Sequence, residues 1–317
     1  MLIKCSICHS AHYKIMGFGG YKYQGQLYNL VRCLKCGFMF LDPKPSQDLL
    51  KKMYNNPEYF IKDYSGGGKI SYQDSFNQNK KTYQEIINRI KRYKKDGLLL
   101  EIGCAGGHFL KFAKDSGYKV EGIEISGVMV ESAKEKLDID IRVGTIEDVK
   151  LPSQAYDIIY LGDVLEHIYN LDSSLKEIFR ILKPSGLLYI DLPSTYNYTL
   201  LGIVTYPLIA LKYFFKGDSV FSKKYFLPRQ HRGKHNVYLP YHLYEFTPKS
   251  IGNLLVKYNF LPIKIISFDG WPKQKDYTMI INKIFYFLKK ISYFITYILN
   301  FMRIGDRITV LAVKKDV

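Results

Sequence analysis

Short apolar runs alternate with helix-like patterns through the middle of the chain. Strand-length runs of mostly apolar residues predict buried strands at 98–102, 119–123, 139–143, 156–161, 187–192 and about 262–268. The apolar spacing between them predicts helices at 108–113, 126–136 and 171–182. Ser126 is the expected N-cap of the second helix. Strands and helices in alternation are typical of a parallel α/β sheet, whose ligands bind at the carboxyl ends of the strands.

Two segments, 193–240 and 270–304, exceed what such a sheet needs. The first begins with an uncharged stretch long enough to cross a membrane, but prolines and an asparagine interrupt it, so we expect no transmembrane span. Basic residues then gather between Lys212 and Lys234. The second segment, drawn as a helix, places Lys283 and other polar residues opposite an apolar face. Such a helix is typical of a protein that lies on an anionic membrane. The alternative is that both insertions pack together as a lid or dimer surface.

The first 45 residues contain four of the five cysteines, in two matching pairs, Cys5-Ser-Ile-Cys8 and Cys33-Leu-Lys-Cys36. Two Cys-x-x-Cys turns can supply the four thiolates of a tetrahedral zinc site, and a site with four protein ligands is structural because no coordination position is open. The residues between the pairs have the pattern of short strands and turns. We therefore predict a zinc ribbon over 1–45. The alternative is four unrelated thiols.

Composition adds a strongly basic balance to this picture. The 317 residues include 46 Lys+Arg against 29 Asp+Glu, a net charge of +17. Apolar residues make up 47%, enough for a full core, which excludes wholesale disorder. The positive charge favours an anionic partner, either nucleic acid, an acidic membrane or a phosphorylated substrate. Lys4 interrupts the apolar start, so no secretory signal is expected and the cytoplasm is the expected compartment.

A glycine-rich turn follows the strand at 98–102. The run Gly103-Cys104-Ala105-Gly106-Gly107 leads from that strand into the next helix. Glycines let a ligand approach the backbone, and a helix N-terminus offers free N–H groups, so this arrangement can hold a nucleotide. Glu124 ends the second strand about 20 positions later, where a carboxylate can accept both ribose hydroxyls. A dehydrogenase or a purely structural turn are the competing interpretations.

These residues resemble the class I S-adenosylmethionine-dependent methyltransferases. The resemblance rests on Glu101-Ile-Gly103-Cys104-Ala105-Gly106-Gly107, on Glu124, on Leu182-Lys-Pro-Ser-Gly186 and on a terminal strand at 307–313. Asp163-Val-Leu-Glu-His167 resembles the subgroup of quinone and small-molecule O-methyltransferases, and Asp42-Pro-Lys-Pro-Ser46 is similar to the linker after an N-terminal zinc ribbon. The resemblance implies a seven-stranded, mostly parallel, Rossmann-like α/β sheet. It divides the chain into the ribbon at 1–45, a helical linker or cap at 46–95, and a methyltransferase domain at 96–317.

The same resemblance implies which residues bind S-adenosylmethionine. Glu101 and Gly103 would hold the methionine amino group, Glu124 would bind the ribose, and Asp163 would lie near the sulfonium. The remaining implied contacts, from the turn and from the segment that flanks the adenine, are Cys104, Ala105, Gly107, Thr145, Ile146 and Glu147.

The acceptor is narrowed by motifs that the sequence lacks. No Asn/Asp-Pro-Pro-aromatic segment follows the fourth strand, which argues against methylation of exocyclic amino groups, and no spare cysteine is placed to methylate a pyrimidine carbon. An oxygen atom or a sugar carbon remains as the predicted acceptor of the methyl group. His167 and His242 are the candidate bases, each weighed against a purely structural role.

Two functions follow from these features. The first is methyl transfer to a small molecule or a lipid-linked saccharide by an enzyme peripheral to the inner membrane face. The second is methylation of RNA, with the zinc ribbon and basic surface holding phosphates. The apolar insertions favour the first, with nucleic acid as the less favoured partner.

Overall fold

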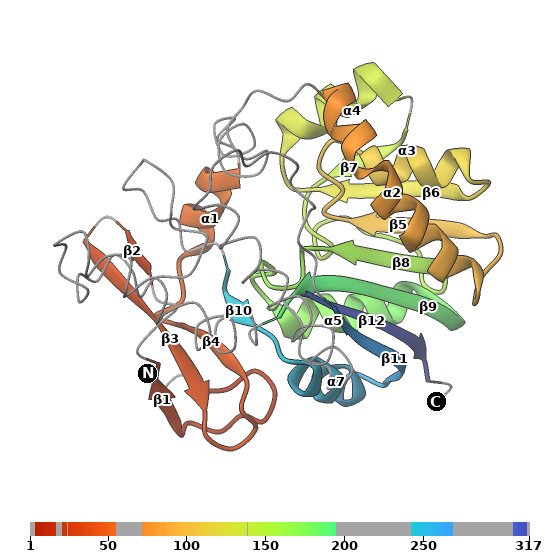
Figure 1. Ribbon diagram of the computed structural model, residues 1–317. Coiled ribbons are helices and arrows are strands. Elements are labelled where there is room, and N and C mark those ends of the chain that lie inside the picture. Colours follow the sequence, from red (N-terminus) through yellow and green to blue (C-terminus); the bar gives the residue numbers. More distant parts are fainter. Residues whose placement is uncertain are drawn as a thin grey trace, which may run out of the picture.

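Two β-sheets organise the part of the chain that the computed structural model describes, which comprises residues 4–16, 21–23, 25–54, 72–137, 139–194, 242–268 and 307–315. Figure 1 shows the sheets side by side. One is a small antiparallel sheet near the N-terminus, and the other is a larger sheet flanked by helices.

The larger sheet has seven strands in the order β11-β12-β9-β8-β5-β6-β7. Strands β5 to β9 pair in parallel, whereas β12 lies antiparallel between β9 and β11. Their bounds are β5 Leu98–Ile102, β6 Lys119–Glu124, β7 Ile141–Val143, β8 Tyr156–Gly162, β9 Leu182–Pro193, β11 Phe260–Phe268 and β12 Arg307–Lys314. The prediction of a seven-stranded, mostly parallel α/β sheet is confirmed.

Five helices pack on this sheet within the described residues. α2 (Tyr72–Lys91), α3 (His108–Asp115) and α4 (Gly127–Leu137) contribute to the hydrophobic core on one face. α5 (Leu171–Ile181) and α7 (Pro248–Lys257) contribute to the core on the other. The stretch predicted as a helical linker, 46–95, contains α1 (Gln47–Tyr54) and α2.

Side-chain alternation along the central strands explains why both faces need helices. In β5, Leu100 and Ile102 enter the core under α5 and α7, whereas Leu99 enters the core under α2 and α3. All three side chains are buried. A strand that is buried on both faces has a continuous run of apolar residues in the sequence, which is why the apolar pattern predicted β5 correctly.

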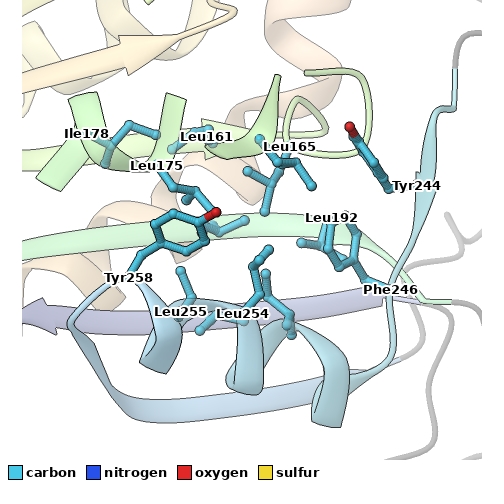
Figure 2. Close-up of a cluster of buried hydrophobic side chains, with 14 of the residues drawn as sticks. Leu161, Leu165, Leu175, Ile178, Leu192, Tyr244, Phe246, Leu254, Leu255 and Tyr258 are labelled. Carbon is cyan, nitrogen blue, oxygen red and sulfur yellow. The ribbon is translucent and has the colours of Figure 1, made fainter. Parts of the chain in front are cut away.

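Helix α7 shows how local sequence sets the boundaries of an element. Thr247 is its N-cap and accepts a hydrogen bond from the Ser250 backbone N–H, while the Ser250 hydroxyl bonds in return to the Thr247 N–H. Pro248 occupies the first turn, where its missing N–H costs nothing. Figure 2 shows Leu254 and Leu255 of this helix packed toward Leu175 and Leu192.

Strand β9 differs from its prediction. The sequence predicted a turn at 183–186 before a strand at 187–192, but β9 already begins at Leu182. Tyr156 pairs with Leu182 and Ile158 with Leu187, so four residues of β9 stand opposite Asp157 alone. This bulge is held by Lys183, whose Nζ lies 2.8 Å from Asp157 Oδ2. The turn residues therefore interrupt the pairing without ending the strand.

The small sheet takes one strand from the C-terminal half of the chain. Its order is β1-β3-β4-β10, and β2 pairs with β3. The bounds are β1 Tyr13–Ile15, β2 Tyr21–Tyr23, β3 Gln26–Cys33, β4 Met39–Asp42 and β10 Tyr244–Glu245. Short strands between the cysteine pairs were predicted, but β10 was not. One hydrophobic core consequently runs from this sheet to α5 and α7.

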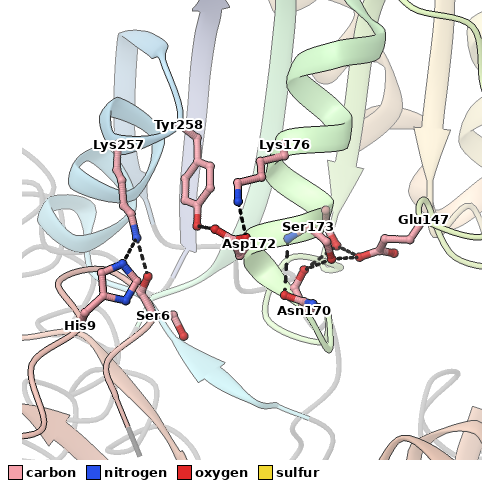
Figure 3. A network of polar contacts seen from close by, with 10 residues as sticks. Ser6, His9, Glu147, Asn170, Asp172, Ser173, Lys176, Lys257 and Tyr258 are labelled. Atoms are coloured by element: carbon pink, nitrogen blue, oxygen red, sulfur yellow. Dashed lines mark hydrogen bonds and ion pairs between the residues drawn. The ribbon is translucent and has the colours of Figure 1, made fainter.

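Polar contacts join the two sheets as well. Figure 3 shows Lys257, at the end of α7, reaching the N-terminal segment. Its Nζ donates to the Ser6 carbonyl oxygen at 2.9 Å and lies 3.1 Å from His9 Nε2. Lys44 Nζ donates to the carbonyl oxygen of Tyr169 and, at 3.1 Å, to the hydroxyl of Tyr244.

Nearly all of both predicted insertions, 193–240 and 270–304, lies outside the described residues, so the membrane-surface and lid hypotheses stay predictions. Within the described ranges no helix is both long and apolar enough to cross a membrane.

Candidate functional site

The glycine-rich turn joins β5 to α3 at the carboxyl edge of the sheet. Gly103 and Gly107 have φ angles of 72° and 71°, in the left-handed region that favours glycine. A methyl group at Gly103 would lie 2.4 Å from Val164 Cγ2, so a side chain at this position would also clash. Ala105 adopts a φ of 45° in spite of its side chain. An alanine at this position of the turn is thus accommodated in the left-handed backbone conformation.

Glu124 holds this turn against the end of β6. Its Oε2 accepts a hydrogen bond from the Ala105 N–H at 2.8 Å, and its Oε1 accepts one from the Ser126 N–H at 2.9 Å. Burial raises the pKa of Glu124, and these backbone donors oppose the shift. Ser126 directly precedes α4 as predicted, but its hydroxyl has no hydrogen-bond partner among the described residues. The carboxylate, rather than the serine hydroxyl, organises this corner.

Glu101 lies beside Glu124 on the neighbouring strand. Its side chain is buried, and Oε2 has no hydrogen-bond partner within the described ranges. Burial, together with the charge of Glu124, raises the pKa of Glu101 well above its ordinary value. A buried carboxylate oxygen without a donor is an acceptor available to a cationic ligand group. This fits the predicted contact with the methionine amino group of S-adenosylmethionine.

Cys104 differs from the other turn residues because its side chain points away from the turn. The side chain is buried in the core under α3 and α4. A methyl group built on Gly122 of β6 would lie 2.8 Å from the Cys104 Sγ. Only the backbone of Cys104 is therefore placed to contact a ligand at this turn.

The segment predicted to flank the adenine follows β7. Thr145 bonds to Asp148 through its hydroxyl and its backbone N–H, which closes a turn. Ile146 is buried in the core, whereas Glu147 is exposed and accepts a hydrogen bond from the Ser173 hydroxyl at 2.9 Å. The Glu147 carboxylate is thus engaged by the first turn of α5, as Figure 3 shows.

Asp163 follows β8 and is positioned by a residue that sequence reasoning missed. Its Oδ1 lies 2.8 Å from Nη1 of Arg307, at the start of β12. Its backbone N–H donates to the Asp191 carbonyl oxygen at 2.9 Å. The Asp163 side chain remains 47% exposed, so the ion pair orients the carboxylate without covering it. The two partners are 144 positions apart in the sequence, so no local pattern reveals the pair.

His167 and His242, the predicted bases, meet each other in space. Their ring centroids lie 4.7 Å apart in an edge-to-face arrangement. Glu166 lies next to the two histidines. No role in the site was predicted for it from the sequence, although one was predicted for the adjacent residue His167. Burial and the charge of Asp163 raise the pKa of Glu166 to about 8. Burial alone would lower the pKa of His242, but the carboxylates of Glu245 and Glu166 outweigh it and raise that pKa.

The four predicted zinc ligands also converge. The sulfurs of Cys5, Cys8, Cys33 and Cys36 all lie within 4.8 Å of one another. The Cys5 and Cys36 sulfurs are 3.4 Å apart, too far for a disulfide and close to the roughly 3.8 Å expected between thiolates on one zinc ion.

The two cysteine turns share one backbone geometry. The fourth residue after the first cysteine of each pair donates to that cysteine's carbonyl oxygen, His9 N–H to Cys5 at 2.8 Å and Gly37 N–H to Cys33 at 2.9 Å. Both residues have a positive φ, 56° at His9 and 78° at Gly37. His9 therefore occupies in the first turn the position that Gly37 occupies in the second.

Comparison with known proteins locates the domain. Residues 100–190 match the sequence family described as "Methyltransferase domain". A ubiquinone biosynthesis O-methyltransferase from Pelagibacter ubique is 32% identical over 123 residues, 37% of this chain and 49% of the relative. A malonyl-[acyl-carrier protein] O-methyltransferase from Yersinia pestis is 24% identical over 119 residues, 37% of this chain and 44% of the relative. The chain thus spans about half the length of the curated relatives it matches.

A solved structure supports the same fold. The PH0226 protein from Pyrococcus horikoshii OT3 is similar with a TM-score of 0.52 at 18% identity, covering 82% of this chain and 100% of that one. Residues 100–190 are thus similar in sequence to a methyltransferase domain, and they lie within a seven-stranded sheet of the kind expected for S-adenosylmethionine-dependent methyltransferases. S-adenosylmethionine is the cofactor expected of that family.

Proposed function

We propose that this chain transfers the methyl group of S-adenosylmethionine to an oxygen atom of a small-molecule acceptor. One observation carries the proposal. The glycine-rich turn, fixed by Glu124, lies at the same sheet edge as the segment after β8 that brings Asp163 and His167 toward His242. The names of two relatives, both O-methyltransferases, support oxygen as the acceptor atom.

The cofactor end of the site would consist of the residues predicted from the sequence. The unpartnered oxygen of Glu101 would accept from the methionine ammonium, and the backbone of Gly103, Ala105 and Gly107 would allow close approach. Asp163 would face the sulfonium, where its exposed carboxylate favours positive charge. Glu124 would bind the ribose from the position in which it already fixes the turn.

The proposed reaction requires the protein to position the two substrates and to assist the loss of one proton. The sulfur–methyl bond breaks as the oxygen–methyl bond forms, and the hydroxyl loses its proton to a nearby base. His167 and His242 are the groups proposed to assist that proton loss, because they lie at the carboxyl end of β8 with Asp163. A saccharide hydroxyl, free or lipid-linked, is the acceptor class to assay first, since it also suits the apolar and basic insertions predicted from the sequence.

Transfer from ¹³C-methyl S-adenosylmethionine tests this function. The full chain would be incubated with phenolic, saccharide and lipid-linked saccharide acceptors, and separately with RNA. We expect a new methyl resonance with the carbon shift of an O-methyl group in one of the small-molecule reactions. Label in the RNA reaction alone, or a methyl group bonded to carbon or nitrogen, would overturn the proposal.

We further propose that Cys5, Cys8, Cys33 and Cys36 hold one structural zinc ion. The proposal is supported by the convergence of the four sulfurs and by the matched turns that present them. Four thiolates fill a tetrahedral site, so this ion would stabilise the small sheet and take no part in methyl transfer.

A further inference from the structure

A second group of side chains that could ligate a metal lies apart from the four cysteines, with two members just after β8 and one just before β10. Glu166, His167 and His242 each offer one ligand atom, and these three atoms lie within 4.8 Å of one another. Two imidazoles and one carboxylate are a ligand set that proteins use for divalent transition metals, and three protein ligands leave coordination positions open.

The burial of Glu166 is the strongest sign that a ligand is needed here. The side chain is 1% exposed, and neither carboxylate oxygen has a hydrogen-bond partner within the described ranges. The neighbouring base, His167 Nε2, lies 3.8 Å from Oε1, beyond hydrogen-bond distance. A buried carboxylate is costly unless it is paired or coordinates a metal. A cation between Glu166 and the two imidazoles would satisfy it.

The backbone fixes the three side chains relative to one another. The N–H groups of Leu243 and Tyr244 both donate to the Glu166 carbonyl oxygen, at 2.9 Å and 3.3 Å. These bonds tie the residues that follow His242 to the peptide that carries Glu166. His242 is therefore held opposite the β8 segment by main-chain contacts, as a preorganised ligand requires.

A carboxylate behind His242 completes the arrangement. Glu245 is buried, and its Oε1 lies 3.8 Å from His242 Nδ1. The Glu245 carboxylate faces the Nδ1 side of the imidazole and interacts with it electrostatically, which favours Nε2 as the ligand atom. The His242 imidazole thus has the Glu245 carboxylate beside Nδ1, and Glu166 and His167 close by as the other candidate ligands.

We propose that Glu166, His167 and His242 bind one divalent transition-metal ion whose open positions face the acceptor. Such an ion would polarise an acceptor hydroxyl and lower its pKa, so that the hydroxyl proton leaves to solvent water as the methyl group is transferred. The two histidines would then serve the reaction as metal ligands instead of acting directly as bases. This catalytic meaning rests on the function proposed above, but the binding itself does not.

Cobalt titration tests the site on the full chain. The protein, with zinc retained on the cysteines, would be freed of weakly held metal with a mild chelator and titrated with Co²⁺. We expect one bound equivalent of Co²⁺ with visible d–d absorption and no thiolate charge-transfer band, because nitrogen and oxygen are the ligands. No bound Co²⁺, or a thiolate spectrum, would overturn the proposal.

Substitutions then place the ion. Glu166→Gln and His242→Gln should each weaken Co²⁺ binding by roughly tenfold or more. His12→Gln, an identical change at an exposed ribbon histidine, should leave it unchanged. If the two buried changes prevent folding, His167→Gln serves instead, since its side chain is 18% exposed. Equal affinity in wild type and all folded variants would contradict the assignment.

Parallel assays separate this proposal from the proposed function. Cobalt binding needs neither S-adenosylmethionine nor acceptor, so it stands even if no methyl product forms with any acceptor. Conversely, methyl transfer that proceeds at full rate in metal-free protein that fails to bind Co²⁺ would remove the metal site and keep the methyltransferase.

Discussion

At the scale of single residues, Glu124 has two roles that substitution can separate. Its carboxylate fixes the glycine-rich turn through the N–H groups of Ala105 and Ser126, and it is the proposed ribose ligand. Removing the carboxylate therefore loosens the turn as well as removing a ligand contact. Glutamine keeps one acceptor oxygen and should preserve part of the first role.

We predict that Glu124→Ala weakens binding of S-adenosylmethionine by roughly tenfold or more, the cost of losing charge-assisted hydrogen bonds. Glu124→Gln should fall between alanine and wild type. Isothermal calorimetry measures both, with Glu131→Gln, an exposed change on α4, as the control. Unchanged affinity in Glu124→Ala would refute the assignment of this carboxylate to the cofactor.

Lys44 is a second residue with a measurable signature. Burial lowers its pKa to about 8, and its Nζ lies 4.0 Å from the centre of the Tyr169 ring. Between this pKa and the ordinary value of 10.5, the unfolded chain holds a proton that the folded chain has released. Folding therefore releases a proton across that window, so stability rises with pH there.

The free energy of unfolding of wild type, relative to Lys44→Met, should increase by about 1 kcal/mol between pH 8 and pH 10.5. Below pH 8 the difference should be constant. Denaturant unfolding at each pH measures it, and subtracting the variant removes the titration of other groups. Lys52→Met, at an exposed position on α1, should give a flat difference. A flat difference for Lys44 would show that its amine is not desolvated.

At the scale of elements, helix α7 depends on its capping box. Thr247 and Ser250 satisfy each other's backbone N–H groups, and the helix buries Leu254 and Leu255 in the core that α5 shares (Figure 2). A frayed first turn would disturb this packing near its start.

Thr247→Ala should lower the free energy of unfolding by about 1 kcal/mol, the usual cost of losing an N-cap side chain. Thr247→Ser keeps the hydroxyl and should recover most of that loss. Chemical denaturation compares the three proteins. If alanine and serine were equally destabilising, the methyl group of Thr247 rather than its hydrogen bond would be the stabilising feature.

Local sequence predicted those elements whose signals are local. The sequence pattern located β5, β6 and β8 to within one residue. β5 and β8 are almost wholly buried apolar runs, whereas β6 is buried only over its second half. The bulge in β9 was predicted as a turn, because Pro184 and Gly186 form turns in most settings and only pairing with β8 reveals the strand. β10 has two residues, and nothing near it in the sequence indicates its partner β4.

The candidate site likewise combines residues that local sequence predicted with contacts that only the fold reveals. The turn and Glu124 could be predicted because motif spacing within one strand–helix–strand unit places them. Arg307 and the approach of His242 to Glu166 could not, because the contacts join segments that are far apart in the sequence. Sequence therefore predicted the positions of the glycine-rich turn and Glu124 better than the contacts around His242.

At the scale of the whole molecule, the small sheet and the seven-stranded sheet share one core. Phe38 lies between the second cysteine pair and β4. Its ring stacks on that of Tyr244, with 5.7 Å between the ring centroids, and its centroid lies 5.5 Å from that of Phe246. Any loss of order around the cysteines therefore exposes apolar surface that belongs to both parts.

Removing zinc with a strong chelator should lower the melting temperature of the full chain in a single transition, because the shared core couples the two parts. Differential scanning calorimetry shows the transition, and Cys36→Ser should reproduce the effect without chelator. Two separate transitions, with the larger one unmoved, would show that the seven-stranded sheet is stable independently of the small sheet.

β10 also has a consequence for how the two metal sites would respond to each other. This short strand pairs with β4, which follows the four cysteines. The backbone N–H groups of Leu243 and Tyr244, directly after His242, donate to the Glu166 carbonyl oxygen. An ion at either end that restrains this segment reduces the ordering that the other ion must impose. By thermodynamic reciprocity, zinc on the cysteines would tighten cation binding at Glu166, His167 and His242 by the same factor as the second cation tightens zinc. The ribbon would then act as a positive effector of the acceptor site.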